Sequence, residues 1–313
     1  MMLETIPVPR AEITNPQEFI SSIESRMPLQ VHGLINDWDA LGWRFDALTE
    51  KYGERKVKVL LDMAKFSGIL EGGQENYEKI MSFADFVKKI LSNPDSPCYM
   101  AYSKATDFLT EEMDAYNFSN ITPHLSYPVD TRLWIGSANT CSGLHTDLKD
   151  NIFAQVIGQK KVFLVPANQT HLVYPFIDNI VNSQVNPEQY EPDKFPKFAS
   201  ATVYSTVVKP GDILSIPRGW WHYLRSESPS ISINHWFGKP VSAYTYLSLL
   251  IKLGSPYLKR TFADMYRYGI LKKEYKKEFF FTPASTGERL FNLIRYGDFS
   301  KENDPANKDP IIK

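Results

Sequence analysis

The chain lacks the features that mark secreted, membrane-spanning and disulfide-rich proteins. It has two cysteines, Cys98 and Cys141, which are too few for a disulfide framework, so a reducing compartment is expected. No run of about 18 uncharged apolar residues occurs, and no membrane span is predicted. The first residues, MMLETIPVPRAEI, lack the basic region and apolar run of a signal peptide. These absences favour a cytoplasmic protein, or a nuclear one in a eukaryote.

An excess of charge of one sign is also missing. The formal net charge is −1 over 313 residues, which argues against attraction of the whole molecule to nucleic acid or to a membrane surface. Hydrophobic residues make up 43% of the chain and aromatic residues 13%, enough for a substantial core. The sequence therefore predicts a globular protein with one large domain, or one domain with an appendage.

Three zones differ in their hydrophobic pattern. Residues 1–95 look like a mixed α/β lead-in, with helical spacing at 15–26, 44–53 and 82–93 and a strand-like alternation at 56–62. Residues 96–239 contain many short β-rich runs separated by turn residues, which is typical of a β-barrel or sandwich. Residues 240–313 return to helical spacing and form a C-terminal helical region.

Turn residues give finer expectations within the β-rich zone. The Gly-Gln pair in IGQK (157–160) suits a tight type II′ hairpin, and YLRSESPSIS is expected to close a second hairpin. The irregular segment 166–200 is too long for a mere connection, and loops of that length within compact domains are often functional.

Six histidines are present, and one of them stands in SGLHTDLKDN, two residues before an aspartate. In an extended chain His145 and Asp147 point to the same side, so an imidazole and a carboxylate converge. On the pair alone, a solvated turn with Asp147 as a helix cap is the simpler interpretation. His222, in GDILSIPRGWWHYL, supplies a third candidate, although it could be a core histidine beside two tryptophans. Two histidines and one carboxylate on a β scaffold are the ligand set of non-haem Fe(II).

A lysine and one strand face add further candidates. Lys160 begins a predicted barrel strand, where an inward-facing ammonium group would need an anion; either Lys160 or Lys161 should face inward. In ISINHWF, Ser232, Asn234 and Trp236 share one face of a strand. That face suits a position beside a metal, while a satisfied buried amide and an ordinary core tryptophan remain alternatives.

Three ordered stretches together resemble a known family. SGLHTDLKDNIFAQVIGQKKVFLVP, KPGDILSIPRGWWHYL and ISINHWF are similar to the JmjC-type 2-oxoglutarate oxygenases, within the cupin-like branch that includes the asparaginyl hydroxylase factor inhibiting HIF. The resemblance covers residues 96–239, and PLQVHGLINDWDAL is similar to the family's lead-in. It implies an α+β, mainly β fold: a double-stranded β-helix, or jelly-roll cupin barrel, with N-terminal helices and a C-terminal helical extension.

The resemblance also implies roles for residues. His145, Asp147 and His222 match the iron ligands. Lys160 matches the lysine that pairs with the distal carboxylate of 2-oxoglutarate. The remaining matched positions are cosubstrate and pocket contacts: Ser142, Tyr99, Asn151 and Asn234. Fe(II), 2-oxoglutarate and O₂ are the implied cofactors, and 166–200 cannot be matched residue by residue.

The implied activity is hydroxylation of a protein side chain, with decarboxylation of 2-oxoglutarate to succinate and CO₂. Demethylation of an N-methyl group, modification of RNA, and a non-catalytic cupin-like binding module remain alternatives. In relatives the C-terminal helices mediate homodimerisation. The basic, aromatic-rich stretch 252–277 fits such a dimer contact or plain packing, and RNA is the alternative partner.

Overall fold

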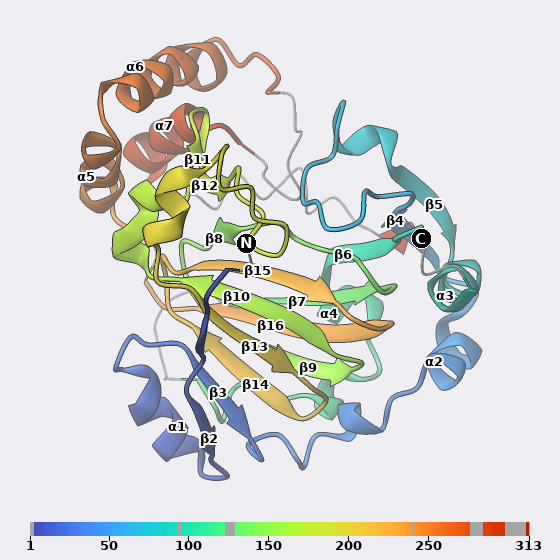
Figure 1. The fold of residues 1–313 in the computed structure, drawn as a ribbon. Helices are drawn as coiled ribbons and strands as arrows, with labels where there is room; N and C mark the ends of the chain where they lie inside the picture. The colour runs from blue at the N-terminus through green and yellow to red at the C-terminus, as the bar shows by residue number, and fades with distance from the viewer. Residues whose placement is uncertain are drawn as a thin grey trace.

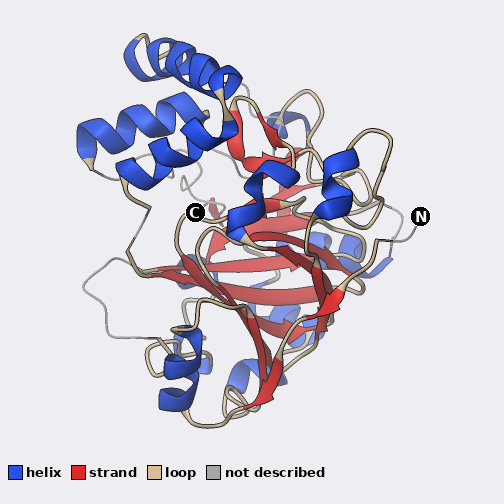
Figure 2. Cartoon of the chain, turned by 60° about the vertical axis from the view of Figure 1, so that its left-hand side comes forward, coloured by secondary structure: helices blue, strands red, loops and turns tan. Residues whose placement is uncertain are grey.

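The computed structural model describes residues 3–92, 96–122, 129–239, 241–275, 284–297 and 311–312. Two β-sheets face each other in the middle of the molecule, and helices lie outside them (Figures 1 and 2). The larger sheet has the spatial order β17 (Ile311–Ile312), β4 (Lys56–Leu60), β6 (Tyr99–Lys104), β7 (Asp130–Gly136), β16 (Ser230–Phe237), β9 (Asp150–Ile157), β14 (Asp212–Ile216), β3 (Leu29–His32) and β2 (Arg10–Glu12), with β5 (Glu78–Ser82) paired to β4.

The smaller sheet carries the strands that alternate with these along the chain. Its spatial order is β1 (Ile6–Pro7), β13 (Tyr204–Val208), β10 (Lys160–Val165), β15 (Trp221–Ser226), β8 (His145–Thr146), β12 (Asn179–Ser183) and β11 (Pro175–Phe176). From β9 to β16, the chain crosses between the sheets at β9–β10, β13–β14, β14–β15 and β15–β16, which is the winding of a double-stranded β-helix. The predicted fold class is therefore confirmed.

Both predicted hairpins are wrong in one respect. The turn at 157–160 is tight, but β9 belongs to the larger sheet and β10 to the smaller one, so the two strands do not pair. The connection from β15 to β16 crosses between the sheets in the same way. Each turn forms a corner of the barrel. In a double-stranded β-helix, two strands that follow each other in the chain lie in different sheets, so the turn between them does not pair them.

The helices close the barrel on its outer side. They are α1 (Pro16–Ile23), α2 (Phe45–Tyr52), α3 (Phe83–Ser92), α4 (Ala105–Phe108), α5 (Ala243–Leu253), α6 (Ser255–Asp264) and α7 (Thr286–Tyr296), with short 3₁₀ segments η1 (Asp39–Gly42), η2 (Gln74–Asn76), η3 (Met113–Ala115), η4 (Ala167–Leu172) and η5 (Pro196–Ser200) and a π-helical segment η6 (Met265–Ile270). The three helices and the strand expected before residue 95 are all present. The Asn15 side chain caps α1, and Ser285 caps α7. None of the described helices has the length and apolarity needed to cross a bilayer.

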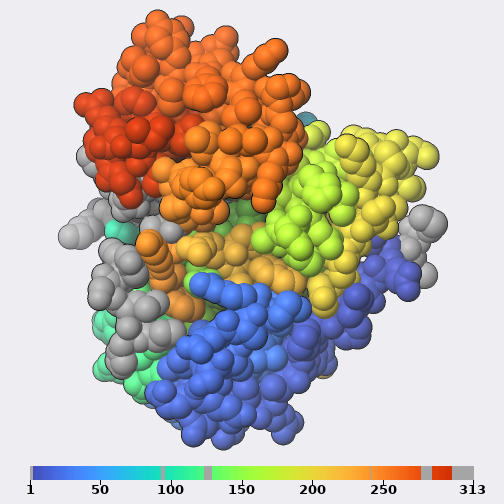
Figure 3. Space-filling view, turned by 90° about the vertical axis from the view of Figure 1, so that its left-hand side faces the viewer, coloured from blue at the N-terminus to red at the C-terminus, as the bar shows by residue number. Residues whose placement is uncertain are grey.

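Separate apolar clusters hold the layers together. Phe153, Val162 and Leu164 pack between the sheets, in the barrel interior. Ile233 and Phe83 belong to a larger cluster that joins the outer face of the larger sheet to the N-terminal helices. On the outer face of the smaller sheet, Trp221 and Tyr223 pack against the 166–200 segment. In Figure 3 the C-terminal helices, in orange and red, lie above the N-terminal residues, in blue, with barrel strands visible between them. The chain division at 95 and 239 stays a prediction.

The corner at Gly158 depends on glycine. Its φ is +70°, and a Cβ there would lie 2.1 Å from the carbonyl oxygen of Pro229 in the β15–β16 connection. The two corners also share hydrogen bonds, from the Gln159 N–H to Ser228 Oγ (3.1 Å) and from the Glu227 N–H to the Gln159 carbonyl (2.9 Å).

Gly158→Ala is expected to lower the free energy of unfolding by about 2 kcal/mol or more, because the chain must relieve both the clash and the positive φ. Urea denaturation followed by circular dichroism would measure it. Gly42→Ala is the matched control, since a Cβ at Gly42 meets nothing within 4 Å. Equal denaturation midpoints for the two variants would contradict the account.

Candidate metal centre

Three side chains from two paired strands converge inside the barrel. His145 stands in β8, Asp147 directly follows it, and His222 lies opposite His145 in the β8–β15 ladder. One ligand atom from each of the three lies within 4.8 Å of the others. Nε2 of His222 is 3.4 Å from Oδ2 of Asp147, and the two imidazole centroids are 4.1 Å apart. The structure therefore brings together the three residues that the sequence singled out.

Backbone carbonyls orient both imidazoles. Nδ1 of His145 lies 3.0 Å from the carbonyl oxygen of Gly143, and Nδ1 of His222 lies 3.1 Å from that of Trp220. A carbonyl oxygen only accepts, so each Nδ1 carries the hydrogen and each Nε2 keeps its lone pair. Burial, together with the nearby His222, lowers the pKa of His145 to about 4. His145 is consequently neutral near pH 7, the state in which histidine binds a metal.

The Asp147 carboxylate is held by neighbours on the larger sheet. Its Oδ2 accepts hydrogen bonds from Trp236 Nε1 (2.7 Å) and Asn151 Nδ2 (3.0 Å), and Asn151 Oδ1 in turn accepts one from Asn234 Nδ2 (3.0 Å). Burial alone would raise the pKa of Asp147, but attraction to His222 and these hydrogen bonds outweigh it. The pKa therefore lies well below its usual range. The His145 and His222 nitrogens and the ionised Asp147 carboxylate are the donor set that suits an Fe(II) ion.

A buried cation lies deeper in the barrel. The Lys160 side chain is 3% exposed, and its Nζ donates to Ser232 Oγ (2.9 Å) and Tyr99 Oη (3.3 Å). No carboxylate among the described residues pairs with it, and burial lowers its pKa from 10.5 to about 7. Lys161, on the opposite face, lies over the ring of Phe163 outside the barrel. A dry ammonium group with two neutral partners fits the carboxylate of a ligand.

Three of the remaining predicted residues, Tyr99, Asn151 and Asn234, occupy the same interior. Tyr99 and Asn234 are buried, and Asn151 links Asn234 to Asp147. The Ser142 N–H donates to the carbonyl of Leu224 (3.1 Å), on the strand that carries His222, but the Ser142 hydroxyl reaches only the Gly143 carbonyl, at 3.4 Å. Ser142 therefore lies beside the strand that carries His222, without a described contact to Lys160.

Trp236 belongs to an aromatic wall beside the triad, and the other two rings of this wall, Tyr102 and Trp134, were not foreseen from sequence. The rings of Tyr102, Trp134 and Trp236 lie 5.8 to 6.4 Å apart, and the Arg132 guanidinium stacks 4.3 Å from the Tyr102 ring while pairing with Asp130 (2.7 Å). Tyr102 belongs to a bulge in β6 and has a φ of +56°. Burial raises its pKa above the usual range. Alternation along β7 and β16 could have indicated Trp134, but a bulge is not readable from the sequence pattern.

Comparisons with known proteins agree with this geometry. Residues 16–243, which include all three converging residues, match the family model described as a cupin-like domain. The chain is 28% identical over 247 residues to lysine-specific demethylase 8 of Xenopus tropicalis, covering 74% of this chain and 54% of the relative. Jumonji C domain-containing protein 5 of Drosophila melanogaster is 27% identical over 246 residues, covering 74% and 59%.

A third relative is more similar over a comparable stretch. HSPB1-associated protein 1 of Homo sapiens is 34% identical over 242 residues, covering 70% of this chain and 49% of the relative. The chain thus spans about half the length of the curated relatives it matches. The family match, the facing sheets and the converging His-Asp-His group lead to one conclusion: the chain belongs to the cupin-like domain family of JmjC-type oxygenases, which use Fe(II), 2-oxoglutarate and O₂.

Proposed function

We propose that the chain is an Fe(II)- and 2-oxoglutarate-dependent dioxygenase that hydroxylates a protein side chain. The observation that carries this proposal is the coexistence, in one barrel, of the His145, Asp147 and His222 group with a buried Lys160 that has no acidic partner in the part of the chain that the structure describes. A non-catalytic binding module would need neither feature. When bound, Fe(II) and 2-oxoglutarate supply the oxidising chemistry, in which 2-oxoglutarate loses CO₂ to become succinate.

The chain's own residues bind, orient and exclude water. The Nε2 atoms of both histidines and the Asp147 carboxylate would hold the metal, while Trp236 and Asn151 fix the direction of the carboxylate. Lys160, with Tyr99 and Ser232 beside it, would anchor the distal carboxylate of 2-oxoglutarate, and Ser142 is matched to the same role by the resemblance. The apolar barrel interior keeps this anchor dry, which strengthens the charge pairing.

Two other activities share the same site. Relatives named lysine-specific demethylases suggest oxidation of an N-methyl group, which this geometry would also allow. We favour hydroxylation because the resemblance in the site region is to the hydroxylase branch, and mass spectrometry separates the two outcomes: a gain of one oxygen atom, or a loss of one methylene.

The C-terminal helices carry the two proposed partner contacts. Apolar side chains of Tyr244 and Ile251 on α5 and Phe262 on α6 are exposed, as a dimer contact would require. The basic stretch 252–277 includes Arg260, which already pairs with Asp178 and Asp264, and its last two residues lie outside the described part. We therefore place homodimerisation ahead of RNA binding for this region. Location in the cytoplasm or nucleus stays a prediction.

The direct test is formation of succinate from 2-oxoglutarate with Fe(II) in air and no added substrate. The wild-type protein should turn over slowly, and Asp147→Ala should abolish turnover because one metal ligand is gone. Asp46→Ala, at a fully exposed carboxylate, is the control and should match the wild type. Equal turnover in wild type and Asp147→Ala, or none in the wild type, would overturn the proposal.

The Lys160 anchor makes binding of 2-oxoglutarate dependent on pH. The folded-state pKa of Lys160 is depressed to about 7, so the empty site loses its ammonium charge above that pH. Because the bound carboxylate requires the charged form, affinity should fall by up to about tenfold for each pH unit from 7 to 9. Calorimetric titration of the Co(II)-loaded protein measures this. Lys160→Arg should flatten the profile, since guanidinium stays charged; a flat profile in the wild type would exclude the anchor.

Trp236 should act as a positioning residue for the metal ligand Asp147. Trp236→Phe removes the N–H that bonds Oδ2 but keeps a ring in the aromatic wall, and Co(II) affinity should drop by about tenfold. Equilibrium dialysis measures it, with Trp43→Phe, at an indole packed on Tyr116, as the matched control. Unchanged Co(II) affinity in Trp236→Phe would mean that the hydrogen bond does not position Asp147.

A further inference from the structure

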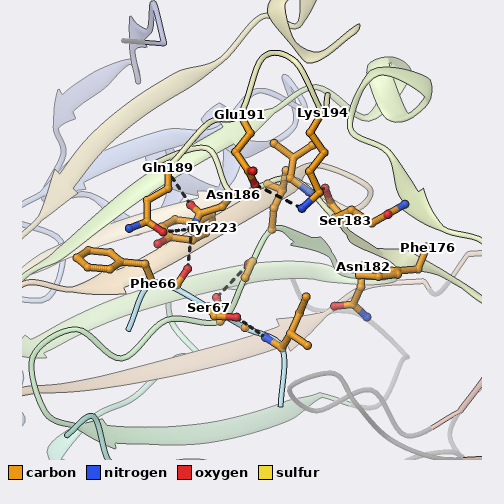
Figure 4. Close-up of a pocket in the computed structure, with 17 residues that line it drawn as sticks. Phe66, Ser67, Phe176, Asn182, Ser183, Asn186, Gln189, Glu191, Lys194 and Tyr223 are labelled. Carbon is orange, nitrogen blue, oxygen red and sulfur yellow. Dashed lines mark hydrogen bonds and ion pairs between the residues drawn. The ribbon is translucent and has the colours of Figure 1, made fainter. Parts of the chain in front are cut away.

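A cavity of about 460 Å³ lies beside the metal centre but outside the barrel. Three chain segments line most of it: the loop 66–69, residues 142–144 that lead into His145, and the 182–194 part of the long irregular segment. Phe176 and Tyr223 complete the lining (Figure 4). None of the three converging residues is among its lining residues. The cavity is therefore a separate site, and its function is not explained by the metal chemistry.

Strand alternation places Leu144 and Tyr223, two lining residues of the smaller sheet, on the face opposite to the metal. His222 and Tyr223 are neighbours in β15, so their side chains point to opposite faces; His222 faces the barrel interior and Tyr223 lines the cavity. Leu144, also in the lining, directly precedes His145. Asn182 also lines the cavity, and it is the register partner of His145 in the β8–β12 ladder, so its side chain shares the face that carries the metal ligands.

The walls of the cavity are tied to each other. Asn186 donates from Nδ2 to the Phe66 carbonyl (2.6 Å) and accepts at Oδ1 from the Gln189 N–H (3.2 Å). Glu188 is held by two hydrogen bonds from Arg225, at 2.6 and 2.7 Å. The loop 66–69 touches the strand backbone so closely that a Cβ on Gly68 would lie 2.5 Å from the Gly143 nitrogen. A cavity with cross-linked walls is a preformed site, which lowers the ordering cost of binding.

The lining chemistry fits a peptide rather than a nucleic acid. Glu191 and Lys194 pair with each other at 3.5 Å, so the lining carries no net charge and offers no spare cation to a phosphate. Two exposed carboxamides stand on one wall: Gln184 Oε1 and Gln189 Nε2 have no hydrogen-bond partner among the described residues. One acceptor and one donor complement the N–H and C=O of a peptide unit.

We propose that this cavity docks an extended, uncharged stretch of the protein substrate, next in sequence to the residue that is oxidised at the metal. The inference rests on the proposed function and deepens it, because it names a neutral peptide as the recognised chemistry. It assigns recognition to Gln184 and Gln189 on the long segment and leaves the chemistry to the barrel.

The test measures binding and needs no turnover. The full chain, loaded with Co(II) and 2-oxoglutarate, is used to select from a phage-displayed library of short random peptides and, separately, from a pool of short random RNA. Selected peptides are synthesised with a fluorophore, and their Kd is measured by anisotropy. Gln184→Trp fills the cavity from an exposed position, and Gln17→Trp makes the same change on exposed α1.

The expected result is that peptides are enriched, and that Gln184→Trp weakens their Kd by at least about tenfold while Gln17→Trp does not. Matching thermal unfolding midpoints would show that both variants fold. Peptides that bind Gln184→Trp as tightly as the wild type, or enrichment of RNA without peptides, would overturn the inference. Failure of the proposed oxygenase would show instead as absent succinate formation in the wild-type protein.

Discussion

A buried ammonium group that has no acidic partner among the described residues is the constraint on which this site depends. Lys160 lies between the two sheets, where its described hydrogen-bond acceptors are two hydroxyl groups, and its pKa is lowered because burial removes its hydration. Left alone, such a group destabilises the fold; a ligand carboxylate would offset that cost. The rest of the interior is organised around the same small space, with apolar side chains that keep water out and a metal-ligand group above it.

The winding of the barrel brings distant parts of the chain to this space. His145 and His222 lie opposite each other because β8 and β15 pair, and Asp147 is steadied from the other sheet by Trp236. Neither sheet alone contains the whole site. The cavity lies along the outer face of the same smaller sheet, next to His145. Strand β8 therefore lies between the metal centre and the proposed docking site of the substrate.

Alternation along single strands made much of the interior predictable. Ser232, Asn234 and Trp236 share the face turned toward Lys160, Asn151 and Asp147, as their spacing indicated. Strand alternation could not choose between Lys160 and Lys161, because the choice depends on which face of β10 is turned toward the other sheet. The predicted hairpin pairings were wrong for a related reason. Turn residues indicate where the chain bends tightly, but they do not indicate which strand pairs with which. The pairing of β15 with β10 and the bulge at Tyr102 were not predictable from local sequence, because both depend on partner strands far away in the chain.

The most direct measurement is the affinity of the Co(II)-loaded protein for 2-oxoglutarate and for 2-oxopentanoate, which has a methyl group in place of the distal carboxylate. The account predicts that the wild type prefers 2-oxoglutarate by about 100-fold, and that Lys160→Met reduces this preference to less than about tenfold. Equal affinity of the wild-type protein for the two compounds would contradict the claim that Lys160 anchors the cosubstrate.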